Sequence, residues 1–186
     1  MSLADLLKKK HDTLAGRWLD AVVATYPSES SDHLLNQKDR FNNPVGDALR
    51  RGLPVILTAL IDGESEDGFA ELIGEIVRIR TVQCNRPSEA FAWVFALKEI
   101  AREELGAGGQ VDGLGADWKE FDGRIDGLVL TMCDEYLACK EAIGEIRVRE
   151  AQRRSAMLIE QVNKLYGGLE GSRDSDVDKK HSAGNL

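Results

Sequence analysis

The chain has 186 residues and a formal net charge of −8, with a sequence pI near 5.0. That length fits one domain with an extension, and the acidic balance excludes a general nucleic-acid or anionic-membrane binder, because either would need a basic surface. Three cysteines without a Cys-x-x-Cys pair, in a chain with no recognisable signal peptide, indicate reduced thiols in the cytoplasm.

The first third of the chain predicts three helices. An amphipathic helix is expected over residues 3–25, because apolar residues recur there at helical spacing. A short helix follows over residues 31–41. Asn43 is expected to cap a third helix with Pro44 in its first turn, where a missing amide donor costs little, and Pro54 is expected to kink this helix.

The middle of the chain predicts two helices that are separated at Pro87. One spans residues 69–83 and the other starts at Pro87, because proline cannot continue a helix begun upstream. Residues 90–97, AFAWVFAL, are all apolar, which predicts a core helix that other helices cover on all sides. This apolar run falls far short of the roughly 20 residues needed to cross a bilayer, so no membrane span is expected.

The last part of the chain predicts one long helix behind a glycine-rich loop. Residues 106–115 contain five glycines and are expected to form the loop. Asp117 is expected to cap the helix, with Glu120 reaching back as in a capping box, and the helix is expected to end at Gly167.

The second half of this long helix carries an alternating four-three pattern that predicts an interface, either within a short helical hairpin or in a two-chain coiled coil. Upstream on the same helix, Gly123 and Gly127 would let another helix approach closely. We therefore expect a helical sensor-like domain over residues 1–145, a connecting or dimerising helix over 146–166 and a disordered tail over 167–186. The predicted interface residues are Val148, Ala151, Leu158, Val162 and Leu165, and Gly144 and Ser155 complete the pattern.

No catalytic, metal or cofactor site can be assembled from the sequence. The histidines lie outside the central helices, and His11 shares a stripe with Trp18, so it is interpreted as a residue at the edge of the core. Cys84, Cys133 and Cys139 have no zinc-site spacing, and no nucleophile can be matched with a base and an orienting group. No metal, cofactor or haem pocket is predicted, and the chain is predicted not to be an enzyme.

Polar groups beside the predicted helix breaks leave two interpretations open. In the first, ion pairs fix the helix packing, because an unpaired buried charge is very costly. The pairs would join Arg78 and Arg80 to Asp39, Asp47 or Glu75. In the second, a small anionic or apolar ligand binds between the third, fourth and fifth helices. Its polar contacts would be Arg40, Arg78, Arg80 and Gln83, and its apolar wall would be Phe91, Trp93 and Phe95.

Three ordered blocks of the sequence resemble a known family. They are QKDRFNNPVGDALRRGL at residues 37–53, IVRIRTVQCNRPSEAFAWVFALKEIAREEL at 76–105 and RIDGLVLTMCDEYLACKEAIGEIRVREAQRR at 124–154. The blocks resemble the signature stretches of the RsbRD N-terminal domain family, the amino-terminal module of a group of RsbT co-antagonist (stressosome RsbR-type) proteins. The resemblance covers about residues 3–154.

The resemblance implies a helical sensory module, globin-like but without haem, that dimerises and passes a signal through its last helix to an output domain. Co-antagonist members carry a carboxy-terminal STAS domain, for which this chain has no room, so a stand-alone relative is expected. The combined expectation is a single all-α bundle with a long C-terminal helix. It would act in the cytoplasm as a homodimer with a partner protein that the sequence does not identify.

Overall fold

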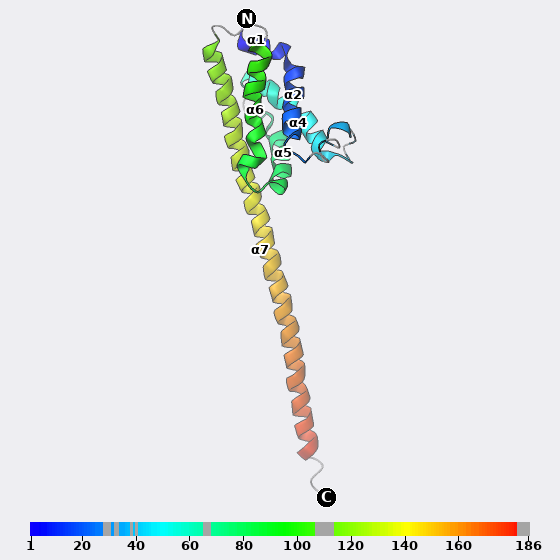
Figure 1. The fold of residues 1–186 in the computed structure, drawn as a ribbon. Coiled ribbons are helices and arrows are strands. Elements are labelled where there is room, and N and C mark those ends of the chain that lie inside the picture. Colours follow the sequence, from blue (N-terminus) through cyan, green and yellow to red (C-terminus); the bar gives the residue numbers. More distant parts are fainter. Residues whose placement is uncertain are drawn as a thin grey trace. The chain divides into compact units, whose positions relative to one another are not determined.

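The protein is all-α. The computed structural model describes residues 1–27, 31, 34–37, 39, 41–64, 68–106 and 114–181, without the side chains of 167–181. Every regular element in those ranges is a helix, which confirms the predicted class. The helices are α1 (Leu3–Lys9), α2 (His11–Val23), α4 (Pro44–Asp62), α5 (Ala70–Gln83), α6 (Pro87–Gly106) and α7 (Gly115–His181) (Figure 1). The chain divides into two units, residues 1–140 and 141–186.

The helix predicted over residues 3–25 is wrong in one respect, because the structure has two helices there. The chain bends at Lys10, whose φ of −103° and ψ of 5° lie outside the helical region. No proline or glycine marks the bend, so the apolar pattern continues across it. Both helices contribute to the same core, and their most deeply buried residues are Leu3, Leu7, Leu14, Trp18 and Val22.

The helix predicted over residues 31–41 also differs from the structure. Of the residues that the structure describes here, Ser31 and residues 34–36 are helical, and Phe41 lies in a turn. The Asp39 carboxylate accepts the Phe41 N–H at 3.1 Å and the Asn42 side-chain amide at 2.6 Å. Such local bonds give the backbone an alternative to the helix, which explains the early end.

The predicted cap of α4 is confirmed. The Asn43 Oδ1 atom accepts the Gly46 N–H at 2.9 Å, and the Asn43 amide donates to the Leu34 and Gln37 carbonyl oxygens. A Cβ atom at Gly46 would lie 2.3 Å from the Asn43 Nδ2 atom, so this cap requires glycine there. The helix continues past Pro54.

The central helix α6 starts at Pro87 as predicted, but the prediction that it is covered on all sides is wrong. Ala92, Phe95 and Glu99 are exposed, and Phe95 retains 44% of its accessible surface. These positions are three and four residues apart and therefore share one face of the helix. The other faces pack in the common core, so residues 90–97 are apolar all round without being buried all round.

Helix α6 lies antiparallel to the first part of α7. Arg102 pairs with Asp122, and Lys98 pairs with Asp126 at 2.6 Å, so descending positions on α6 meet ascending positions on α7. Figure 1 shows the two helices side by side. The side of α7 that faces the core carries Phe121, Ile125, Leu128, Met132 and Tyr136.

Both predicted ends of the long helix need correction. Helix α7 begins at Gly115, so Asp117 lies in its first turn and is not its cap. The Asp117 carboxylate instead accepts the Leu3 N–H at 3.4 Å, and Glu120 pairs with Arg124, which rules out the predicted capping box. At the other end, the helix continues to His181, past the predicted end at Gly167. Most of the predicted glycine-rich loop, residues 107–113, lies outside the described residues.

Candidate functional site

Arg80 is the buried member of the predicted arginine site. Its side chain is only 3% exposed. The guanidinium donates from Nε to the Ala90 carbonyl oxygen and from Nη2 to the Glu89 carbonyl oxygen, both at 3.1 Å. It also lies 4.8 Å from the centre of the Tyr26 ring, a distance that allows a cation–π contact. Carbonyl dipoles and a ring face, at the start of α6, therefore surround this charge.

The other predicted polar residues do not join Arg80 in one pocket. Arg78 is exposed, because it lies two residues before Arg80 on α5 and therefore on a different face of the helix. Gln83 is also exposed, and its side-chain oxygen accepts the Tyr26 hydroxyl at 2.9 Å. Arg40 lies outside the residues that the structure describes.

The ion pairs predicted for Arg78 and Arg80 are replaced by others. Arg51 on α4 pairs with Asp47 at 2.9 Å and with Glu75 of α5 at 3.1 Å. Asp47 precedes Arg51 by one helical turn, which makes this pair available without any tertiary contact. Two of the acids that the sequence offered to the α5 arginines, Asp47 and Glu75, thus pair with Arg51, which the sequence analysis did not single out, and the Glu75 pair joins α4 to α5.

The predicted apolar wall of a ligand pocket is split between core and surface. Phe91 and Trp93 are buried, and the Trp93 ring lies 5.6 Å from the Trp18 ring. The Trp18 indole N–H donates to the Trp93 carbonyl oxygen at 3.3 Å. Phe95 is exposed on the open face of α6. The buried rings of Phe91, Trp93 and Trp18 fill the interior. Two pockets among the described residues lie elsewhere.

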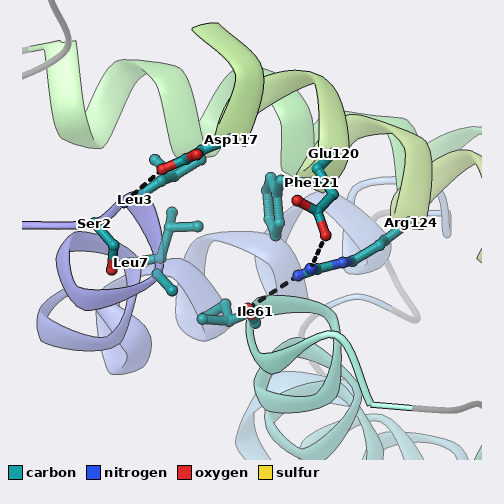
Figure 2. Close-up of a pocket in the computed structure, with 9 residues that line it drawn as sticks. Ser2, Leu3, Leu7, Ile61, Asp117, Glu120, Phe121 and Arg124 are labelled. Atoms are coloured by element: carbon teal, nitrogen blue, oxygen red, sulfur yellow. Dashed lines mark hydrogen bonds and ion pairs between the residues drawn. The ribbon is translucent and has the colours of Figure 1, made fainter. Parts of the chain in front are cut away.

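The first of these pockets has a volume of about 100 Å³ and lies between α1, the end of α4 and the start of α7. Figure 2 shows Asp117 reaching Leu3 on one side and Arg124 reaching Ile61 on the other. The volume is well below the roughly 300–1,000 Å³ of sites for drug-sized ligands. The lining residues are Ser2, Leu3, Ala4, Leu7, Ile61, Asp117, Glu120, Phe121 and Arg124.

Arg124 separates this pocket from a second one of about 130 Å³ and closes the end of α4. Its Nη1 atom donates to the carbonyl oxygens of Leu60 and Ile61 at 2.9 and 3.1 Å, and its Nη2 atom donates to Glu120 at 2.6 Å. The last carbonyls of a helix lack intrahelical partners and carry partial negative charge, so a guanidinium stabilises them. Arg124 is therefore a structural cap, and both its Nη1 and its Nη2 atom already donate hydrogen bonds within the protein. No local pattern in the sequence marks this role.

Histidines and thiols show no arrangement for chemistry in the described part of the chain. The His11 Nε2 atom lies 3.1 Å from the Pro54 carbonyl oxygen and 3.0 Å from the Thr58 hydroxyl, so this ring links α2 to α4. The three cysteines are free and half-buried, and burial raises the pKa of the Cys133 thiol. Over the described residues, no group of three or more histidine, cysteine or acidic side chains is placed to hold a metal, and no helix is long and apolar enough to span a membrane.

All five predicted interface residues are exposed in the unit of residues 141–186. Val148, Ala151, Leu158, Val162 and Leu165 recur, with Ser155 between the second and the third, at three- and four-residue steps, which place them along one side of α7. Further large apolar side chains are exposed beside them. These are Ile146, Met157, Ile159 and Tyr166. Exposed apolar surface of this extent is typical of a segment that binds another chain.

Comparison with known proteins yields one match. A family model with the description "RsbT co-antagonist protein rsbRD N-terminal domain" matches residues 12–151. No curated protein and no solved structure matches the chain. The matched range contains the first two sequence blocks, the third block up to residue 151, all of α4, α5 and α6, and α2 apart from His11. The expected likeness to globins stays a prediction.

Proposed function

The chain belongs to the family of RsbT co-antagonist protein rsbRD N-terminal domains, and from this membership we propose that it is a non-enzymatic regulatory module that acts by binding other protein chains. The family comprises stressosome-type sensor modules, and their cytoplasmic location supports the same location for this protein. The match over residues 12–151 is the observation that carries the proposal.

Homodimerisation through residues 144–165 is the part of this proposal that the structure supports most directly. Leu158, Val162 and Leu165 each leave about half or more of their surface exposed. Burial of a side chain of this size contributes roughly 1.5–3 kcal/mol. In a dimer that aligned the same residues, these three side chains would be buried in both copies. The small residues Gly144, Ala151 and Ser155 would contribute little.

The mass of the full chain in solution, measured by light scattering beside a chain ending at Glu145, tests the dimer. We expect the full chain to be a dimer and the shortened chain to be a monomer. Leu158→Glu should also give a monomer, because it places a charge in the contact. Met157→Glu is the matched control, since Met157 is 56% exposed, close to the 61% of Leu158, but lies off the seam. The same oligomeric state for both chain lengths would contradict the proposal.

A further inference from the structure

We propose that the pocket at the start of α7 binds a small organic cation, namely a primary ammonium ion with a short alkyl chain. Figure 2 shows this pocket, which lies between α1, the end of α4 and the first turns of α7 and has a volume of about 100 Å³. It is called the α1–α7 pocket below. All its lining residues belong to the unit of residues 1–140, so the site does not depend on the proposed dimer, and it is distinct from the ligand site that the sequence predicted around Arg80.

The base of the α1–α7 pocket is apolar and buried. Its lining includes four apolar side chains that are each at most 3% exposed, those of Leu3, Leu7, Ile61 and Phe121. In Figure 2, Leu3 and Leu7 lie on one side of the pocket and Phe121 lies on the other. The Glu120 side chain also lines the pocket and is 68% exposed, so the pocket leads from solvent to an apolar interior. An alkyl chain placed there would exchange water for apolar contacts, which is favourable.

Asp117 places an unmatched negative charge at this pocket. Its carboxylate accepts the Leu3 N–H at 3.4 Å, which is longer than the roughly 2.7–3.2 Å of a usual N–H···O bond, and no cation in the described part of the chain pairs with it. An ionised carboxylate can accept about four hydrogen bonds, so most of this capacity remains. An ammonium ion offers three N–H donors, and hydrogen bonds between opposite charges are about twice as strong as neutral ones.

The groups around Asp117 favour a cation over an anion. Glu120 adds a second carboxylate to the lining, and the Arg124 guanidinium already donates to Glu120 and to the Ile61 carbonyl oxygen. Two carboxylates and one guanidinium leave a net charge of −1. Ile61 also belongs to the last turn of α4, where the carbonyl groups carry partial negative charge. An anion in the pocket would be repelled by these groups, whereas an ammonium ion would be attracted.

The volume of the pocket selects a short alkyl chain. A protein cavity of about 150 Å³ holds benzene, which has six carbon atoms. By the same ratio, the volume of about 100 Å³ holds about four heavy atoms. Propylammonium, with three carbons and one nitrogen, has this size and is therefore a suitable probe. Its neutral counterpart is 1-propanol, which has the same number of heavy atoms and no charge.

A titration of the full-length chain with propylammonium chloride tests the site. The amide signals of nitrogen-15-labelled protein are followed by NMR, with sodium chloride added to keep the ionic strength constant. We expect saturable shifts for residues that line the pocket, including Leu3 and Phe121, and a dissociation constant in the millimolar range, since few ligand atoms make the contacts. 1-Propanol should bind about 10-fold more weakly or less tightly still, because it lacks the charge that Asp117 attracts.

Two variants separate the charge of the pocket from its shape. Asp117→Asn keeps the size of the side chain but removes its charge, and should weaken propylammonium binding by about 10-fold or more. Asp134→Asn is the matched control, because it removes the same charge from an exposed position of α7 outside the pocket, and it should leave the affinity unchanged. Ala4→Leu retains Asp117 but fills the pocket that Ala4 lines, and should abolish the shifts.

Four results would each overturn the assignment. They are the absence of saturable shifts, shifts confined to residues away from the pocket, equal affinities for 1-propanol and propylammonium, and an unchanged affinity in Asp117→Asn. Circular dichroism of each variant checks that it folds. If Asp117→Asn does not fold, Ala4→Leu and the comparison with 1-propanol decide the question, since both leave the carboxylate in place.

Discussion

Gly63 depends on a residue sixty-one positions away. It ends α4 with a φ of 69°, in the left-handed region that side chains disfavour, and its N–H donates to the Ala59 carbonyl oxygen at 2.8 Å. A Cβ atom there would also lie 2.6 Å from the Arg124 Nη2 atom. Glycine is therefore required twice at this position, once for the backbone turn and once for the guanidinium that caps the helix.

Gly63→Ala should destabilise the protein by about 2–3 kcal/mol, from roughly 1–2 kcal/mol for the left-handed backbone plus displaced Arg124 hydrogen bonds. Urea unfolding followed by circular dichroism measures the change. Gly16→Ala is the matched control. Gly16 lies inside α2 with nothing within 4 Å of an added Cβ atom, so alanine there should stabilise by about 0.5–1 kcal/mol. Equal effects of the two substitutions would contradict this account of Gly63.

At the scale of the element, α7 combines two stripes of different use. One side is buried by the helices of residues 1–106, and the opposite side is exposed although it carries Leu130 and Leu137. Sequence periodicity detected the core stripe and the 144–165 seam separately. It did not single out the exposed leucines at 130 and 137, because Gly127 and Asp134 interrupt the apolar pattern there.

Ser155→Leu should strengthen the proposed dimer, because it adds apolar surface on the seam of residues 144–165. We expect the dissociation constant to fall by about 10-fold, which corresponds to about 1.4 kcal/mol. Sedimentation over a dilution series measures it. Ala156→Leu also adds apolar surface, at the neighbouring exposed residue off the seam, and should leave the dissociation constant unchanged. Equal strengthening by both would indicate general stickiness and contradict the seam.

At the scale of the whole molecule, folding and association divide between the two units. Residues 1–140 hold the hydrophobic core, and no described residue between 141 and 166 is buried. The second unit therefore contributes little to the stability of an isolated chain. In the proposed dimer it would gain its contacts from the second copy.

A chain ending at Lys140 should keep its helical core and melt cooperatively, with a melting temperature independent of protein concentration. The melting temperature of the full chain should rise with concentration, because a second copy that binds only the folded state stabilises it by mass action. Thermal melts at two concentrations differing by about 100-fold, followed by circular dichroism, measure both. A concentration-independent melt of the full chain would contradict stabilisation by dimerisation.

The sequence by itself determined the all-α class, the family, the Asn43 cap and the start of α6 at Pro87, because helical period, side-chain caps and proline act between residues close in the chain. Only the tertiary structure decided the bend at Lys10, the carbonyl contacts of Arg80 and the cap that Arg124 gives to α4. The bend has no proline or glycine to mark it, and the Arg80 and Arg124 contacts join groups on different helices. Local periodicity shows that a face is apolar, but which neighbour covers it is decided by packing between distant segments.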